Sequence, residues 1–393
     1  MVDLLVRTPW WQRVLAIFVA SRIVTTALLL WFASRQGPNP WTGAHPGYFD
    51  FARIWDAHWY YIIALTGYPS VLPVTETGAI GENAWAFMPA YPAVVRGLMV
   101  ITGLDFAVIG VLVSVAFAAG TSLLLYRLFE RLLGPGTALF SVVLFCVAPL
   151  SPIYQVAYAE SMHTFFLVLA LLLLQNRQYW LMIPVITVMA LTRPSGLAFA
   201  LALLLHLCYR WWRRGEFPWR ERIAIVVVGL FSAFMGVAWL LAAWFVTGSP
   251  TAYTDTELAW RAGYGFTGEL VPFEPWLLGA QFWLQFREGP LIVGLAVLLL
   301  AALVWLVGFS RAGRRIGVDN RFWLASYLLY LLAVFFPQSS TFRLLVPLFP
   351  VLGIVAQPRS RVYRIAVVVA MIIGQYLWLQ ATWLVSGSDW TPP

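Results

Sequence analysis

The segment 51–69 places ionisable and aromatic side chains close together in a way that could support chemistry at a membrane boundary. Asp56 and Tyr60 lie one helical turn apart, with His58 between them. A partly desolvated carboxylate is a stronger base, so Asp56 is a candidate general base. An alternative of similar weight is that Asp56 only caps a helix or pairs with Arg53, three residues earlier.

Glu160 and His163 form a second candidate pair, because residues three apart share one face of a helix. Ionisable side chains at membrane depth are costly and are therefore functional candidates. The alternative for Glu160 is an acid at a helix N-terminus, which the helix dipole favours. A di-iron centre would need two E-x-x-H pairs, so with four histidines in the chain we predict no metal site, although a divalent metal is not excluded.

Arg193 and Arg343 each stand in a polar turn among hydroxyl side chains, in the segments 191–196 and 338–343. A guanidinium has forked donors and a permanent charge, which suit it to binding phosphate. The alternative is that both arginines reach lipid headgroups from the ends of spans. Glu82 precedes a turn formed by Pro89, Tyr91 and Pro92, and it is functional or simply a solvated loop acid.

The composition shows what kind of scaffold must position these residues. Of 393 residues, 61% are hydrophobic and only 11% are charged, and all 25 basic side chains are arginine. Mean hydropathy is +0.79. This is too little polar surface for a water-soluble globule, so the sequence predicts an all-α polytopic membrane protein. The arginines sit beside apolar runs, which explains the pI of about 9.7 without any nucleic-acid partner.

We predict about eleven membrane spans: 12–33, 105–126, 137–150, 161–176, 179–192, 196–209, 222–246, 290–309, 321–337, 342–356 and 364–385. Prolines interrupt the run from 137 to 209, so the boundaries of the spans there are uncertain. If the N-terminus is cytoplasmic, most arginines fall in short inside turns, including Arg7 and Arg214. Segments 34–104 and 247–289 are then long extracytoplasmic loops. The first loop should carry a helix that lies on the membrane surface and ends at Gly67. The apolar face of this helix is formed by Phe51, Ile54, Trp55, Trp59 and Ile62. A rigid turn should then lead into a second short helix.

Several segments resemble, in this order, the PIG-V-like mannosyltransferases, the family of GPI mannosyltransferase 2. The matching pieces are Ser21-Arg22, Trp55-Asp56-Ala57 with Gly67-Tyr68, Ala86-Phe87-Met88-Pro89 with Tyr91-Pro92, Tyr158-Ala159-Glu160-Ser161 and Arg193-Pro194-Ser195-Gly196. The resemblance implies a type C glycosyltransferase (GT-C) fold across a single domain, residues 1–393. It also implies transfer of mannose from polyprenyl-phosphate-mannose to a glycolipid or other acceptor outside the cytoplasm.

Under this resemblance Asp56 is the base, and Arg193 and Arg343 hold the donor phosphate. Candidates for positioning the sugar or acceptor are His58, Tyr60, Glu82, Tyr91, Glu160 and His163. No cofactor is implied, because the lipid-linked sugar is a substrate. Direct displacement assisted by one base would invert the anomeric configuration.

The lysine-free composition is typical of a GC-rich bacterial genome and suggests an actinobacterial member in the plasma membrane. Two alternatives remain: a flippase or transporter of lipid-linked sugar, and a non-catalytic scaffold of the cell envelope. The lack of a visible internal repeat weakens the transporter alternative, because related halves often bracket a transport site.

Overall fold

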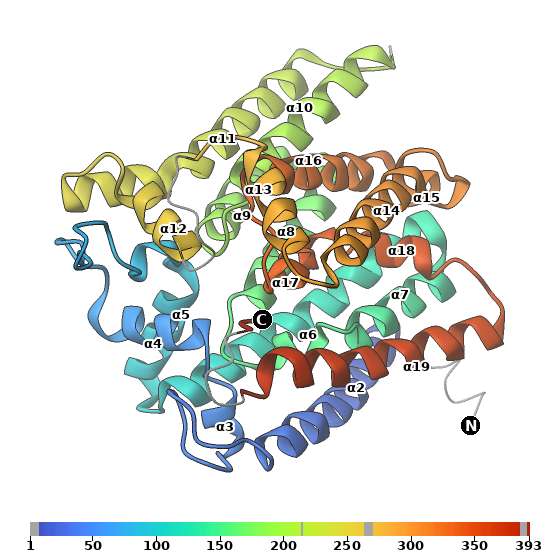
Figure 1. Ribbon diagram of the computed structural model, residues 1–393. Helices are drawn as coiled ribbons and strands as arrows, with labels where there is room; N and C mark the ends of the chain where they lie inside the picture. The colour runs from blue at the N-terminus through green and yellow to red at the C-terminus, as the bar shows by residue number, and fades with distance from the viewer. Residues whose placement is uncertain (1–7, 214, 263–269, 386–390) are drawn as a thin grey trace. The chain divides into compact units, whose positions relative to one another are not determined.

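A computed structural model describes residues 8–213, 215–262, 270–385 and 391–393 (Figure 1). Arg7, Arg214 and residues 263–269 of the predicted second outer loop lie outside the described residues. The described part is all-α apart from one isolated bridge between Val74 and Ile80. The chain divides into two compact units, one of residues 1–64, 91–172 and 339–393, and one of residues 65–90 and 173–338.

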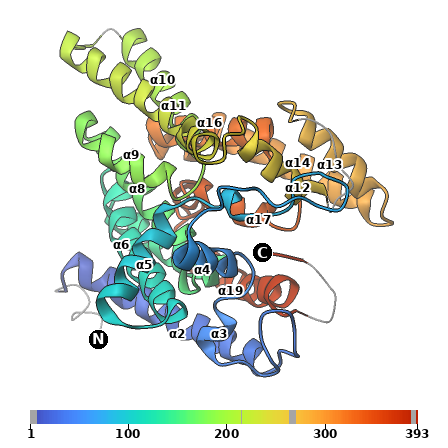
Figure 2. The same ribbon diagram turned by 90° about the vertical axis from the view of Figure 1, so that its left-hand side faces the viewer.

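In the first unit α7 is the central helix, since α2, α6, α18 and α19 all pack against it. Figure 2 shows α4 beside α5, in agreement with the contact between the rings of Tyr60 and Tyr91. The elements of this unit are α2 (Trp10–Ala33), α3 (Tyr48–Phe51), α4 (Asp56–Thr66), α5 (Ala90–Thr102), α6 (Phe106–Leu133), α7 (Pro135–Val147), η2 (Ser151–Gln155), α8 (Glu160–Gln175), α17 (Thr341–Leu344), η4 (Val346–Leu348), α18 (Val351–Val355), α19 (Arg361–Trp378) and η5 (Leu379–Trp383).

Local sequence sets the ends of the long helices. Asp105 caps α6 by accepting a hydrogen bond from the Ala107 N–H at 3.0 Å. The same helix ends at Gly134, whose φ of +80° is accessible to glycine at little cost. Pro135 then begins α7 at a position where its missing N–H is not needed. This turn folds α7 back against α6.

Arg22 is buried in the middle of α2 and holds the C-terminal end of α7. Its guanidinium donates to the carbonyl oxygens of Cys146 at 2.8 Å and Ser151 at 2.9 Å, and to the hydroxyls of Ser21 and Ser151. The last carbonyls of a helix have no partner within the helix, so a cation at that end satisfies both their hydrogen bonding and the helix dipole. Arg22 therefore fixes the chain where it leaves α7 and enters η2.

The second unit is built around the antiparallel hairpin of α10 and α11, visible in Figures 1 and 2. Gly196 and Gly236 allow the two helices to touch, since a Cβ at Gly196 would lie 2.6 Å from the Gly236 nitrogen. The helix α16 packs on α10. The elements are η1 (Ala84–Ala86), η3 (Tyr179–Leu181), α9 (Met182–Ala190), α10 (Gly196–Trp212), α11 (Trp219–Thr247), α12 (Ala252–Ala262), α13 (Glu274–Leu284), α14 (Gly289–Gly308), α15 (Arg311–Arg315) and α16 (Val318–Val334).

Five described helices are long and apolar enough to cross a membrane: Trp10–Ala33, Phe106–Leu133, Trp219–Thr247, Gly289–Gly308 and Arg361–Trp383. The chain is thus a multi-pass membrane protein. Four further predicted spans, 137–150, 161–176, 179–192 and 196–209, coincide with shorter apolar helices, and 321–337 with the 17-residue α16. The total of eleven spans and the direction of insertion remain predictions.

Two predicted helices are wrong in part. The span 342–356 is broken into α17, η4 and α18, because Pro347 and Pro350 have no N–H to donate and interrupt the helical ladder. The surface helix expected from Phe51 onward is interrupted at 52–55, and α4 begins only at Asp56. Its predicted end at Gly67 is confirmed, with φ of +74°.

Candidate active site

Asp56 is the first residue of α4, and the residue before it adopts an uncommon backbone conformation. Trp55 has φ of +61°, in the left-handed region that bulky side chains rarely occupy. Its indole N–H donates to the carbonyl oxygen of Thr382 at 3.0 Å, and its ring lies 4.4 Å from that of Trp41. Burial of this side chain therefore holds the strained backbone in place, and the chain turns sharply into Asp56.

The carboxylate of Asp56 pairs with the guanidinium of Arg343, through Oδ2 and Nη1. The Arg343 Nε also lies 3.5 Å from Oε1 of Glu160. The side chains of Arg343, Asp56 and Glu160 are 8%, 16% and 4% exposed, so two carboxylates share one nearly buried cation. Arg53, the partner considered from the sequence, pairs instead with Asp50 at 3.3 Å.

Tyr158 completes this group. The backbone N–H of Asp56 donates to its hydroxyl at 3.1 Å, and the Arg343 guanidinium carbon lies 5.6 Å from its ring centroid. Burial, and then the negative charge of Asp56, raise the pKa of Tyr158 well above its usual value, so the phenol stays neutral. We call Asp56, Tyr158, Glu160 and Arg343 the active-site cluster.

Sequence reasoning missed Tyr158, although it stands in a quoted motif two residues before Glu160. Every residue from Ser151 to Thr164 is buried, although this stretch is largely outside regular α-helix before Glu160. A polar, aromatic, proline-containing segment that is fully buried must satisfy its backbone through specific contacts. That combination is the signal that could have identified Tyr158.

Tyr60 and Tyr91 pack edge to face at a centroid distance of 5.2 Å, and Tyr60 lies 6.5 Å from the ring of Tyr158. The Tyr91 hydroxyl donates to the carbonyl oxygen of Gly110 at 2.9 Å and contacts Ser114, whose own hydroxyl donates to the Tyr158 carbonyl oxygen. Tyr91 thus ties α5 to α6 beside the cluster. Both tyrosines are buried.

His163 is buried in the first turn of α8, one turn after Glu160, as the spacing predicts. The neighbouring Ser161 hydroxyl is also buried and has no hydrogen-bond partner among the described residues. His58 differs, since its side chain is exposed on the other side of α4 from Tyr60. The structure therefore brings Asp56, Tyr60, Glu160 and Arg343 together and leaves His58 outside this contact network.

Two predicted residues belong to the second unit. Glu82 is exposed, whereas the adjacent Asn83 is buried, caps η1 through the Trp85 N–H and donates to Thr256 at 2.8 Å. Arg193 is half-buried in the turn after α9, where its carbonyl oxygen accepts a hydrogen bond from Ser195. Roles for Glu82 and Arg193 in donor or acceptor binding remain predictions.

Arg193 lies near an acidic side chain that the sequence did not single out. Burial raises the pKa of Glu257 on α12, while the charge of Arg261, a hydrogen bond from Tyr253 and the charge of Arg193 act against this rise. Tyr253, Glu257 and Arg261 recur every four residues and so share one helix face. This four-residue spacing of polar side chains was the signal in the sequence that could have identified Glu257. Among the described residues no group of three or more His, Cys, Asp and Glu side chains could hold a metal ion.

No protein-family model matches the chain, and no curated protein sequence matches it. Solved structures of an oligosaccharyltransferase from Archaeoglobus fulgidus do match. One, tethered to an acceptor peptide containing the NVT sequon, has a TM-score of 0.46 and 11% identity over 96% of this chain and 56% of that chain. The other, a complex with zinc and sulfate, has a TM-score of 0.38 and 15% identity over 93% and 48%. This chain therefore spans about half the length of those it matches, and similarity at this level leaves reaction and substrate undetermined.

Proposed function

We propose that the chain is a GT-C-type glycosyltransferase that moves mannose from polyprenyl-phosphate-mannose to a lipid-linked or other acceptor outside the cytoplasm. The observation that carries the proposal is the buried contact of Asp56 with Arg343, with Glu160 on the same guanidinium. A base beside a fixed cation is what transfer from a phosphate-linked donor requires. The choice of mannose comes from the sequence resemblance to PIG-V-like enzymes.

In the proposed reaction Asp56 accepts the proton of the acceptor hydroxyl while that oxygen attacks the anomeric carbon. The bond from this carbon to the phosphate oxygen breaks, and the prenyl phosphate leaves with the electron pair. Its developing charge is stabilised by Arg343, while the role of Arg193 in holding the donor phosphate stays a prediction from the sequence. A single displacement turns a β-linked donor into an α-linked product.

In this proposal Arg343 has two functions: it orients the base Asp56, and it binds the donor phosphate. Before the donor binds, Arg343 pairs with the Asp56 carboxylate and holds it in one orientation. A guanidinium has five N–H donors, so an arriving phosphate can displace Asp56 while Glu160 stays beside Nε. Donor binding then releases the base at the moment it is needed.

The remaining candidates have positioning roles in this proposal. Tyr60 and Tyr91 are buried beside the cluster, so in this proposal they act on the substrate indirectly, by holding the surroundings of the cluster in place. Glu160 and His163 orient the sugar or its phosphate. Acceptor contacts of His58 and of Glu82, both in the predicted first outer loop, stay predictions from the sequence. The enzyme acts on the extracytoplasmic face of a bacterial plasma membrane, with its N-terminus in the cytoplasm.

The test is transfer of radiolabelled mannose from purified polyprenyl-phosphate-mannose to a lipid extract, catalysed by the purified chain in detergent. We expect Asp56→Asn to reduce turnover by about 10²–10⁴-fold while donor binding persists. Asp50→Asn is the matched control, because Asp50 is an exposed acid paired with Arg53 a few residues away. Its turnover should equal that of the parent.

Near-parental turnover of Asp56→Asn would remove Asp56 from the base role. If the parent chain transfers no mannose but moves labelled donor across the bilayer of proteoliposomes, the flippase alternative is correct. If it does neither and the envelope glycolipids are unchanged in cells carrying Asp56→Asn, the scaffold alternative is correct.

A further inference from the structure

The tip of the α10–α11 hairpin, residues 209–222, is basic and rich in tryptophan. Trp211, Trp212 and Trp219 are 65%, 84% and 69% exposed. Arg213 and Arg220 are exposed, and Arg222 is half-buried. We call the described residues of this stretch, 209–213 and 215–222, the hairpin tip. Tryptophan prefers the headgroup level of a bilayer, so this end of the hairpin is suited to the membrane surface.

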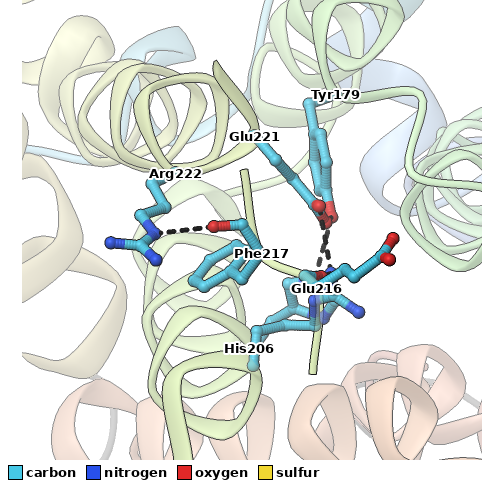
Figure 3. A network of polar contacts seen from close by, with 7 residues as sticks. Tyr179, His206, Glu216, Phe217, Glu221 and Arg222 are labelled. Carbon is cyan, nitrogen blue, oxygen red and sulfur yellow. Dashed lines mark hydrogen bonds and ion pairs between the residues drawn. The ribbon is translucent and has the colours of Figure 1, made fainter. Parts of the chain in front are cut away.

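Arg210, one of the arginines of the tip, takes part in a network of hydrogen bonds within the protein. Arg210 donates to the Glu221 carboxylate at 3.0 Å and to the Glu216 carbonyl oxygen at 2.9 Å. The Tyr179 hydroxyl donates to Glu221 at 2.8 Å and lies 3.1 Å from His206, as Figure 3 shows for these side chains. Beyond them, His206 Nδ1 contacts the Asp319 carboxylate at 2.7 Å. We call Tyr179, His206, Arg210, Glu221 and Asp319 the Tyr179 network, and it makes the base of the tip rigid.

Two other arginines are held in place but keep donors to offer. Arg222 donates through Nε to the Phe217 carbonyl oxygen at 2.9 Å, as Figure 3 shows. Its guanidinium carbon also lies 4.9 Å from the ring centroid of Trp211 and 5.1 Å from that of Phe217. Arg213 donates through Nε to the Tyr209 hydroxyl at 2.9 Å. The terminal nitrogens of both guanidinium groups have no hydrogen-bond partner among the described residues. Each is therefore a preoriented pair of donors.

The charges of the tip do not cancel. Arg210 is offset by Glu221, and Glu216 is the one exposed acid among the described residues of the tip. Arg213, Arg220 and Arg222 therefore leave a net positive charge there. A surface of this kind attracts anions, and guanidinium groups bind phosphate with forked geometry.

We propose that the hairpin tip binds the phosphate headgroup of an anionic phospholipid. The apolar surface next to the tip decides for a lipid over a soluble partner, because Leu204, Ile223, Val226 and Val227 are each at least 40% exposed along α10 and α11. A ligand that has a phosphate at one end and acyl chains at the other fits both surfaces. The site is independent of the proposed mannosyl transfer, since none of its residues belongs to the active-site cluster.

The experiment is native mass spectrometry of the purified full chain in detergent, titrated with phosphatidylglycerol or with phosphatidylcholine of the same acyl chains. We expect the parent to bind phosphatidylglycerol more tightly, and the double variant Arg213→Gln/Arg222→Gln to weaken that binding by about 10- to 30-fold. Inorganic phosphate at millimolar concentration should not compete, because it lacks the acyl chains.

The matched control is Arg359→Gln/Arg361→Gln, which removes two exposed arginines at the start of α19, where no tryptophan is nearby in the sequence. It should bind phosphatidylglycerol like the parent. Equal weakening in both double variants would overturn the site, as would equal binding of the two lipids by the parent. If the glutamine variant does not fold, Arg213→Lys/Arg222→Lys keeps the charge and should lose only part of the affinity; full parental affinity would refute forked recognition.

Discussion

The active-site cluster and the Tyr179 network use the same kinds of side chain on different frameworks. In the Tyr179 network, regular packed helices α10, α11 and α16 supply four of the five residues. In the active-site cluster, Arg343 comes from a four-residue helix, Tyr158 from a segment outside any helix, and Asp56 from a position that follows a left-handed Trp55. Helix packing alone can produce the first arrangement, whereas the second stores backbone strain and persists where a specific geometry is required.

This contrast predicts that conservative changes in the active-site cluster affect rate, and that the same changes in the Tyr179 network affect stability. Arginine-to-lysine exchange should show the largest difference. Arg343→Lys loses the fork that reaches both Asp56 and Glu160, so initial rates at low donor concentration should fall by about 100-fold. Arg210→Lys should stay within about two-fold of the parent in the same assay. Equal losses would mean that the two clusters do not differ in function.

Removing one negative charge should have a smaller effect. Glu160→Gln removes one of the two carboxylates beside Arg343, and we expect a loss of transfer rate of about ten-fold, from roughly 1.5 kcal/mol of charge-assisted interaction. Glu221→Gln weakens contacts to Arg210 and Tyr179, so the unfolding midpoint in detergent should drop while the rate is kept. The comparison fails if Glu221→Gln slows transfer as much as Glu160→Gln does.

Glycine-to-alanine exchange should reveal how tightly the segment next to Tyr158 is packed against α6. A Cβ at Gly110 would lie 2.8 Å from the Ala157 Cβ, so Gly110→Ala must displace the chain next to Tyr158 at a cost of about 1–3 kcal/mol. At Gly229 the nearest atom would be Leu203 Cβ at 3.9 Å, and Gly229→Ala should stabilise α11 by about 0.5–1 kcal/mol. Thermal unfolding followed by tryptophan fluorescence measures both. An unfolding midpoint of Gly110→Ala equal to or above that of the parent would show that the segment around Ala157 can move to accommodate the added methyl group.

The smallest expected effect comes from two phenol-to-phenyl changes. Tyr158→Phe removes the acceptor of the Asp56 N–H, which should slow transfer by about five-fold, for a hydrogen bond of about 1 kcal/mol. Because burial raises the Tyr158 pKa, the phenol stays neutral and the variant should keep the shape of the parent's pH–rate profile. Tyr179→Phe should lower the unfolding midpoint alone. A shifted basic limb in Tyr158→Phe would indicate that Tyr158 ionises during the reaction.

Much of the framework could be predicted from composition and periodicity. The long apolar runs predicted most of the helices and Gly67 predicted the end of α4, whereas a joint role of Asp56 and Arg343 was expected only from the family resemblance. The break before Asp56 could not be predicted, because Trp55 adopts its left-handed conformation through contacts with Trp41 and Thr382, far away in the chain. Apolar spacing carries no record of such tertiary contacts.

Tyr158 and Arg22 illustrate the same limit. Each was visible in a motif, but its role depends on a partner that lies 100 or more residues away: the Asp56 N–H is 102 residues from Tyr158, and the carbonyl oxygens of Cys146 and Ser151 are 124 and 129 residues from Arg22. Spacing arguments work within one helix or turn. Hydrogen bonds between distant segments become visible only when the fold is known.

The anchoring of Arg22 has a consequence for biosynthesis. Its acceptors on Cys146 and Ser151 emerge from the ribosome more than 120 residues after it, which at about 5–20 residues per second is a delay of roughly 6 to 25 seconds. Until then the nascent first span carries an unsatisfied charge, at a cost of about 2.5–3.5 kcal/mol at the bilayer centre. The buried hydrogen bonds that stabilise this span therefore form only after α7 has arrived.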